Sequence, residues 1–351
     1  MYSAAADTEM NPFLIMAFGA ISSWVLLIPA RAVLKIVGIV DRPNGRSSHS
    51  VPTVRGGGIA LVAVIAAYVV GWLWWQDPIR MLCLLSAFSV LSVISFIDDL
   101  RGVGASIRFA IHGAAAVAGV IGLFVSYAQS ISIAIVVVSL VATVWIAGYT
   151  NAFNFMDGIN GIAGAQALVT GLGTAGIAAS LGVPASKPAI TLALVVAGAS
   201  VGFLPHNFPK ARVFMGDVGS APLGFLLAVL AVWVAALTSW WVLFWIALLH
   251  SNFVLDTGIT LLRRAMRGQR LSEAHREHFY QRLVRAGWSH TAVTSTEFGL
   301  QVVVGFLLWW ATPGAPAVRV IVACIVVAIW LGFFAFAERV FNDSPAGANR
   351  A

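Results

Sequence analysis

The chain has 351 residues, of which 60% are hydrophobic and only 10% are charged, and its mean hydropathy is +0.90. So few charged side chains exclude a soluble globule, because they supply too little polar surface for a soluble protein of this length. The formal net charge of +7 could suggest nucleic acid. The basic residues instead lie beside hydrophobic segments, which favours a membrane protein with no nucleic-acid partner.

About eleven apolar segments are long enough to cross a bilayer, at ~20 residues per span. Because a backbone in lipid must satisfy its own hydrogen bonds, they predict an all-α polytopic transmembrane bundle. No repeat or linker divides the chain, so we expect a single integral domain over residues 1–351. The expected spans are 12–36, 56–75, 80–97, 106–125, 131–149, 162–181, 188–205, 221–238, 240–262, 296–312 and 316–337.

Basic residues are divided unevenly between the two sides of this bundle. Of the 21 Lys and Arg residues, all but Arg80, Lys187 and Arg319 fall on one side. Because cytoplasmic loops carry the excess of positive charge, we expect the N-terminus outside and the C-terminus in the cytoplasm. Topology alone explains many of these arginines. The expected cytoplasmic loops are 41–55, 98–105, 150–161, 206–220 and 263–290.

The first polar loop has the sequence DRPNGRSSHSVPTVRGGG over residues 41–58. His49 and Arg55 stand near its three consecutive glycines. Such groups can hold a substrate phosphate or contact anionic lipid headgroups, and the loop alone does not decide between the two.

Two adjacent carboxylates, Asp98 and Asp99, end the third span in the sequence SVISFIDDLRG. They repel each other and are partly desolvated at a membrane boundary, which is costly without a compensating group. A divalent metal, a phosphate-bound Mg²⁺ or a role as general base would each compensate. The structural alternative is an ordinary acidic helix end paired with Arg101.

The segment NAFNFMDGINGIAG places Asn151, Asn154 and Asp157 three residues apart. On a continuous helix they would form one polar stripe, continued by the glycines at every third position from Gly158. Amides and a carboxylate at this spacing suit a ribose, a sugar or a base edge. Close helix packing explains the glycines without a function, but it does not explain the three polar side chains.

In PHNFPKARVFMGDVGSAPLG, Asp217 lies between two glycines at the expected start of a span. Backbone N–H groups at a helix start can receive phosphate oxygens, and Asp217 can hold the Mg²⁺ that bridges them. Phe214 could stack on a base. A simple turn explains the same pattern without function.

The basic loop 263–290 is expected to contain a short amphipathic helix, with Ser272 as its N-cap and Gly287 as its stop. His275, His278 and Arg282 would then share one face. Such a face can clamp a phosphate or bind anionic lipid headgroups.

The last four of these five motifs, in this order, resemble the polyprenyl-phosphate N-acetylhexosamine-1-phosphate transferase superfamily, the glycosyltransferase 4 group. The resemblance runs from about residue 38 to 290 and rests on FIDDLRG, NAFNFMDGINGIAG, NFPKARVFMGDVGS and HREHFYQRL. It implies a transferase in which Asp98, Asp99 and Asp217 are catalytic. Asp98 could be a base or a nucleophile, a choice that the sequence leaves open.

The resemblance also implies ligands for each motif. Asp217 would bind Mg²⁺, for which Mn²⁺ can substitute. The residues expected to contact substrate are Asn151, Asn154, Asp157, Asn207, Phe214, His49, Arg55, Arg276, His278 and Arg282. Of these, Asn207 and Phe214 would contact the uracil end of the nucleotide sugar.

Two departures from the family pattern bear on the sugar. Asn160 stands where relatives often have a second acidic residue, and Tyr280 and Gln281 interrupt a run that is consecutive histidines elsewhere. The pattern HREHFYQR resembles most the branch that starts O-antigen-type glycans, within lipopolysaccharide biosynthesis, on UDP-linked deoxy-N-acetylhexosamines.

We therefore expect transfer of a sugar 1-phosphate from a UDP-N-acetylhexosamine to undecaprenyl phosphate, with release of UMP. The expected location is the bacterial inner membrane with the active site facing the cytoplasm, among membrane lipids, and a homodimer is a candidate assembly. One alternative is a membrane transporter, although transporters place ionisable groups near the bilayer midplane. The other is a different phosphotransferase acting on a lipid phosphate, such as a CDP-alcohol phosphotransferase, whose Asp-Gly-x-x-Ala-Arg pattern is absent here.

Overall fold

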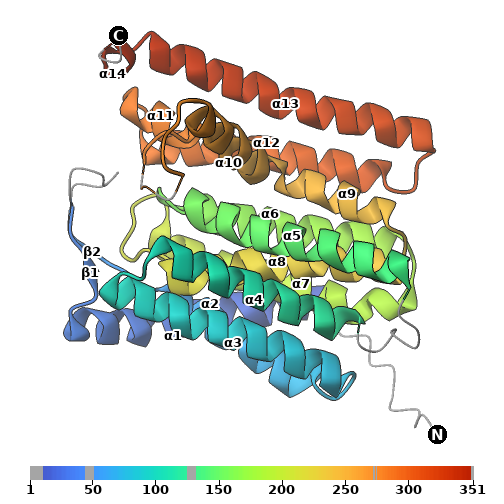
Figure 1. The fold of residues 1–351 in the computed structure, drawn as a ribbon. Helices are drawn as coiled ribbons and strands as arrows, with labels where there is room; N and C mark the ends of the chain where they lie inside the picture. The colour runs from blue at the N-terminus through green and yellow to red at the C-terminus, as the bar shows by residue number, and fades with distance from the viewer. Residues whose placement is uncertain (1–10, 44–50, 125–131, 272, 274, 349–351) are drawn as a thin grey trace, which may run out of the picture.

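The computed structural model describes residues 11–43, 51–124, 132–271, 273 and 275–348, and within them it is almost entirely helical (Figure 1). The elements are α1 (Pro12–Val37), β1 (Val40–Asp41), β2 (Thr53–Val54), α2 (Gly58–Tyr68), η1 (Val69–Leu73), α3 (Pro78–Arg101), α4 (Ala105–Phe124), α5 (Ile133–Met156), α6 (Ile162–Ser180), η2 (Pro184–Ser186), α7 (Lys187–Asn207), α8 (Asp217–Leu237), α9 (Trp241–Ala247), η3 (Leu248–His250), α10 (Ser251–Met266), α11 (Phe279–Arg285), α12 (His290–Ala311), α13 (Pro316–Asn342) and α14 (Pro345–Ala348).

The predicted polytopic bundle is confirmed. Ten helices in the described part of the chain are long and apolar enough to cross a membrane. The second predicted span is shorter than expected, because its apolar helix runs only from Gly58 to Leu73 and ends in a π-helical turn, η1. Several helices start at a side chain that accepts from their first turn, such as Asp77 before α3 and Ser289 before α12.

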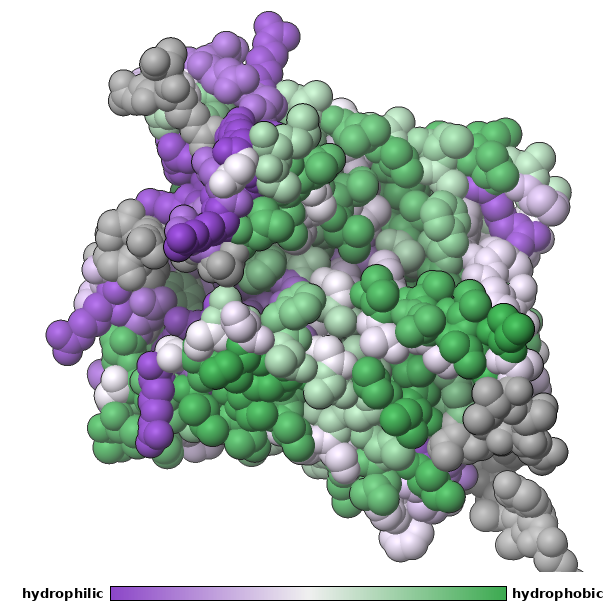
Figure 2. Space-filling model, viewed as in Figure 1, coloured by the Kyte–Doolittle hydropathy of each residue, from purple (hydrophilic) through white to green (hydrophobic). Residues whose placement is uncertain are grey.

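Polar residues gather at one end of the bundle. The β1–β2 hairpin, the α5–α6 turn and the α10–α11 loop lie together at the left of Figure 1. Figure 2 shows hydrophilic residues concentrated at this end, while hydrophobic residues cover most of the rest of the visible face. The candidate loops therefore share one end, as expected for loops on one side of a membrane.

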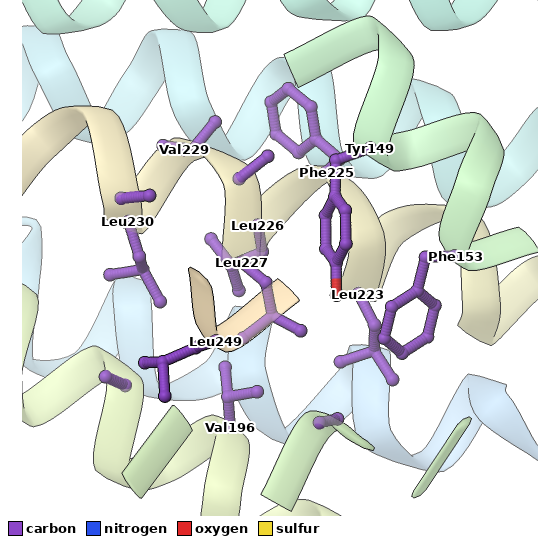
Figure 3. Packing of buried hydrophobic residues seen from close by; sticks show 14 of the residues in the cluster. Tyr149, Phe153, Val196, Leu223, Phe225, Leu226, Leu227, Val229, Leu230 and Leu249 are labelled. Carbon is purple, nitrogen blue, oxygen red and sulfur yellow. The ribbon is translucent and has the colours of Figure 1, made fainter. Parts of the chain in front are cut away.

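Helix α8 is the centre of the bundle, and nearly all of its residues are buried. Its leucines pack against Tyr149 and Phe153 of α5 and Val196 of α7 (Figure 3). Such close packing holds α8 rigidly, and Asp217 is the first residue of this helix.

The predicted span 240–262 is a broken helix. It consists of α9, the 3₁₀ turn η3 and α10, so that backbone groups near Leu249 lose their regular helical partners. Gln166 of α6 donates to the Leu249 carbonyl at 3.1 Å, and Gln301 of α12 donates to the same oxygen. These buried side chains supply the hydrogen bonds that the break removes.

Candidate active site

Asp99 fixes the start of α8 against the end of α3. Its side chain is fully buried, and its two oxygens accept from the backbone N–H groups of Asp217 and Val218, each at 3.0 Å. The first N–H groups of a helix have no partner within it, and negative charge is favourable at this end. Asp99 therefore acts as an anchor that holds Asp217 in place.

Two arginines meet the carboxylate of Asp217. The Arg55 guanidinium lies 2.9 Å from Oδ1 of Asp217 and 2.7 Å from Oδ1 of Asp99. The Arg108 guanidinium lies 3.6 Å from Oδ2 of Asp217 and 2.9 Å from Oδ2 of Asp98. The three aspartates expected to be catalytic thus lie close together, in one cluster that we call the acidic cluster (Asp98, Asp99 and Asp217).

The alternative in which Asp98 is an ordinary helix end paired with Arg101 is wrong, because Asp98 has other partners. Asp98 accepts from the backbone N–H of Val103 and pairs with Arg108 at the start of α4, whereas Arg101 is exposed. The turn between α3 and α4 folds back over the carboxylate, so Asp98 joins the two helices rather than ending one of them.

A small patch of backbone pairing brings Arg55 to the acidic cluster. Strand β2 pairs with β1, and Val54 also forms a bridge with Val213. Phe214 donates its N–H to the Val54 carbonyl and accepts from the N–H of Gly57. The first polar loop is therefore tied to the segment just before α8, although the two are far apart in sequence.

The electrostatics of the acidic cluster leave it negative. Two guanidiniums face three carboxylates. Burial by itself lowers the pKa of Arg55, but Asp217 and Asp99 outweigh it and raise the pKa above its ordinary value, so Arg55 stays charged. Burial raises the pKa of Asp157 to about 7, and the carboxylate of Asp217 acts in the same direction.

This excess of negative charge fits a divalent cation. Among the described residues, no group of three or more His, Cys, Asp or Glu side chains is arranged to hold a metal by itself. Mg²⁺ is usually held by one or two carboxylates together with substrate phosphates, so a complete protein cage is not required. Asp217, whose side chain is 16% exposed, can supply one such carboxylate beside Asp98.

A small cavity opens beside the acidic cluster, between α3, α4, α5 and α8. Its polar lining comprises Ser95, Asp98, Arg108, His112, Asn154 and Asp217. Asn154 accepts from the Ser220 hydroxyl at 2.6 Å, which links α5 to α8. The Nδ1 atom of His112 is buried and has no hydrogen-bond partner among the described residues. These two side chains reach the cavity with a capacity to bind polar groups.

The polar stripe predicted for Asn151, Asn154 and Asp157 is only partly correct. Helix α5 ends at Met156, and Asp157 caps that end rather than continuing the helix. Asn151 donates to Ala147 of its own helix at 2.7 Å. Gly161 has a φ of +81° in the turn that follows, so its conformation, rather than helix packing, requires glycine.

Asn207 ends α7, and Phe214 lies in the segment that leads from α7 to α8. The Asn207 side chain is buried, accepts from the N–H of Gly161 at 2.6 Å and donates to the Val213 carbonyl at 2.8 Å. It therefore joins the α5–α6 turn to the segment before α8. Phe214 is half-buried, and its contact with a uracil stays a prediction.

The helix predicted in the loop 263–290 begins later than expected. Ser272 lies outside the described residues, and α11 starts at Phe279 with His278 as its cap. His275 therefore precedes the helix instead of sharing its face. Burial, with the charges of His278 and Arg264, lowers the pKa of His275 to about 4, so this imidazole is neutral at pH 7.

His278 is held by a buried carboxylate that the sequence analysis did not identify as a site residue. Asp256 of α10 lies 2.8 Å from Nδ1 of His278 and accepts from the backbone N–H of Phe279 at 2.9 Å. The next aromatic ring, Tyr280, donates its hydroxyl to the Phe155 carbonyl at 3.2 Å. Tyr280 also fills the space above Gly158. The basic loop 263–290, which we call the histidine loop, therefore touches the segment that carries Asp157.

The two arginines expected in this loop have protein partners. Arg282 is 1% exposed and donates to both carboxylate oxygens of Glu338 in α13, at 2.6 Å each. Its guanidinium therefore holds α11 to α13 rather than standing open to substrate. The Arg276 backbone carbonyl accepts from Arg285, and contact of the Arg276 side chain with substrate stays a prediction. His49 lies outside the described residues, so its role stays a prediction.

Sequence reasoning did not select Arg108, His112 and Asp256 as site residues. Each is a polar, ionisable side chain within or at the edge of a predicted span, and such residues are usually functional. Arg108 and His112 are also four residues apart, on one face of α4. That spacing was the available signal.

Comparison with known proteins decides the family. The glycosyl transferase family 4 matches residues 81–235. A decaprenyl-phosphate N-acetylglucosaminephosphotransferase of Mycobacterium tuberculosis is 30% identical over 318 residues, which cover 78% of this chain and 76% of that protein. The chain belongs to glycosyl transferase family 4.

Other members are similarly related. A probable undecaprenyl-phosphate N-acetylglucosaminyl 1-phosphate transferase of Bacillus subtilis is 29% identical over 75% of this chain and 74% of its own length. A phospho-N-acetylmuramoyl-pentapeptide-transferase of Enterococcus faecalis is 28% identical over 84% of this chain and 96% of its own length. The family 4 protein is thus a multi-pass membrane enzyme that transfers a phospho-sugar, which excludes the transporter alternative.

Proposed function

We propose that this family 4 protein transfers a sugar 1-phosphate from a UDP-N-acetylhexosamine to undecaprenyl phosphate and releases UMP. The observation that carries the proposal is the convergence of three aspartates and two arginines at the polar end of a transmembrane bundle. The names of the relatives, which act on polyprenyl phosphates or phospho-sugars, support the same reaction.

In this reaction an oxygen of the lipid phosphate attacks the phosphorus that bears the sugar. The bond from this phosphorus to the oxygen that bridges the two phosphates breaks, and UMP leaves with that oxygen. Negative charge builds up on the transferring group. The protein must therefore offer positive charge where three phosphates meet.

Asp217 would hold Mg²⁺, which when bound neutralises the diphosphate and polarises it. Arg55 and Arg108 are partly exposed, at 34% and 35% of their side chains, while still touching the acidic cluster. Each can turn from its carboxylate towards a phosphate oxygen once substrate arrives. This exchange of partners keeps both guanidiniums charged and paired throughout.

We propose that the lipid phosphate lies beside Asp98. The cavity next to Asp98 is bounded on its apolar side by Leu91, Ile94 and Ile111. Nearby, Ile97 of α3 and Phe109 of α4 are exposed on the outer surface of the bundle, at 40% and 65%. A polyprenyl chain can lie along such a surface with its phosphate at the cavity.

We propose that the nucleotide sugar lies towards the end of α5, where Asn154 lines the same cavity as Asp98 and Asp217. Asn154 and Asp157 at the end of α5 can contact the sugar or ribose hydroxyls, and Phe214 can stack on uracil. Tyr280 joins the histidine loop to this region, so the residues that depart from the family pattern are close to where a sugar would lie. We infer from these residues that the donor carries a deoxy sugar of the kind that starts O-antigen-type glycans. The transfer would take place on the cytoplasmic face of a bacterial inner membrane.

The test is an exchange assay with purified protein. Labelled UMP is incubated with undecaprenyl phosphate, Mg²⁺ and each of a panel of UDP-linked compounds, and labelled CMP is incubated in the same way with the corresponding CDP-linked compounds. We expect label to enter one or more UDP-N-acetylhexosamines, only when the lipid phosphate is present. Exchange into CDP-linked compounds alone, or into none, contradicts the proposal.

A further inference from the structure

A second polar cluster lies inside the bundle and shares no residue with the acidic cluster. It comprises Gln166 of α6, Asn252 of α10, and Glu297 and Gln301 of α12. All four side chains are at most 4% exposed. They line a cavity of about 10 Å³, which is room for one water-sized species.

The amide groups in this cluster have only one consistent orientation. Asn252 donates its NH₂ to Oε1 of Gln166 at 2.8 Å, and Gln166 donates to Thr170 and to the Leu249 carbonyl. Gln301 donates its NH₂ to the same Leu249 carbonyl. Reversing Asn252 or Gln301 would place oxygen against oxygen, so their own oxygens must face elsewhere.

Three acceptor oxygens remain over after these bonds are made. Oδ1 of Asn252, Oε1 of Gln301 and Oε1 of Glu297 are buried and have no hydrogen-bond partner among the described residues. The amide N–H groups of Gln166 and Gln301 satisfy the Leu249 carbonyl at the helix break. That role does not explain the three unpaired oxygens or the presence of a carboxyl group. Buried acceptors without partners are costly, so something must satisfy all three.

Glu297 lacks a positive partner. No Lys, Arg or His in the described part of the chain forms an ion pair with it, and the charged group that acts on it is another carboxylate, Asp256. A buried carboxylate without a compensating charge is very unfavourable. An ionised Glu297 with neutral carbonyl oxygens would suit a cation of a single charge, because oxygen ligands are those that hard cations prefer.

We propose that this cavity binds a monovalent metal cation, Na⁺ or K⁺, through Glu297, Asn252 and Gln301. The cation would join α10 and α12 beside α6. Helix α6 follows the turn that contains Asp157, and α10 carries Asp256, which holds His278. The cation therefore stabilises the helices beneath the sugar-side loops, whether or not the proposed substrates are correct.

The test measures thermal unfolding of the purified full-length protein in detergent with EDTA, so that divalent ions do not contribute. Choline chloride is replaced stepwise by NaCl or KCl at constant ionic strength, because choline is too large for the cavity. We expect one of the two metal ions to raise Tm by about 2–4 °C with a saturating dependence on concentration. An equal Tm in choline, Na⁺ and K⁺ overturns the proposal and indicates a protonated Glu297 with a water molecule.

Three variants assign the response to this cavity. Glu297→Gln should lose the cation-dependent rise, and Glu297→Asp, which keeps the charge, should retain it with a higher midpoint concentration. Glu273→Gln, a matched change at an exposed carboxylate, should behave as the wild type. A rise in Glu297→Gln as large as in the wild type overturns the site, and the wild-type salt comparison stands even if that variant fails to fold.

Discussion

At the residue scale, the two adjacent aspartates of α3 do different work. Asp99 is wholly enclosed and caps α8 through two backbone N–H groups, whereas Asp98 faces the cavity beside α4. A pair that looks equivalent in sequence is thus divided into an anchor and a group that can reach substrate. Alternate faces of one helix turn produce this division, because successive residues point about 100° apart.

This division predicts unequal effects on stability. Asp99→Asn removes a buried acceptor and the charge that faces Arg55, and should cost about 1–3 kcal/mol of unfolding free energy. Asp98→Asn keeps an oxygen for the Val103 N–H and should cost less. Thermal unfolding in detergent measures both. Equal losses in the two variants would show that Asp99 is not the anchor.

The roles proposed for Asp98 and Asn154 should separate kinetically. Loss of an interaction made only in the transition state lowers kcat, whereas loss of uniform binding raises KM. Asp98→Asn should therefore lower kcat by roughly 100-fold or more with little change in the KM for the nucleotide sugar. Asn154→Ala should chiefly raise that KM. Calorimetry in which both variants lose UDP-sugar affinity equally would merge the two groups into one nucleotide site.

At the element scale, the spans were predictable and their junctions were not. Hydropathy alone locates α3, α5 and α8, since a bilayer requires long apolar helices. The end of α5 at Met156 and the late start of α11 depend on tertiary contacts such as Asp256 with His278, which local sequence does not encode. The same holds for the pairing of Val54 with Val213, which brings Arg55 to Asp217.

The contact between the α5–α6 turn and α11 gives a prediction at this scale. A Cβ atom on Gly158 would overlap the Tyr280 hydroxyl, so Gly158→Ala should displace the histidine loop and lower activity. Tyr280→Phe removes the atom in conflict, and the double variant should recover much of the activity lost in Gly158→Ala. Turnover of the three variants is compared, with Gly299→Ala, where a Cβ meets open space, as the control. No recovery in the double variant would show that Gly158 is needed for another reason.

At the scale of the whole molecule, the gathering of polar loops at one end agrees with the uneven distribution of Lys and Arg. The acidic cluster, the α5–α6 turn and the histidine loop come from separate parts of the chain and meet at that end (Figures 1 and 2). A cytoplasmic location for this end would give the site access to soluble nucleotide sugars while α3 and α4 remain in contact with lipid.

Cysteine labelling tests this topology. In a chain with Cys83 and Cys324 replaced by serine, Ser180→Cys is exposed at the end of α6, and Lys210→Cys is exposed before α8. An impermeant thiol reagent added to intact cells should label position 180 and miss position 210, as the distribution of basic residues predicts. Permeabilised cells should label both. The reverse pattern in intact cells would place the acidic cluster outside.

The most direct test of the acidic cluster as the phosphoryl-transfer site is the turnover of Asp217→Asn. This change removes the carboxylate proposed to hold Mg²⁺, and Asp343→Asn, at an exposed carboxylate, is the matched control. Transfer from the best UDP-N-acetylhexosamine to undecaprenyl phosphate is measured in Mg²⁺ for both variants, with thermal unfolding as the check on folding. We expect a folded Asp217→Asn protein without measurable transfer, and a control with wild-type turnover. Near wild-type turnover in Asp217→Asn would contradict the assignment of this cluster as the catalytic centre.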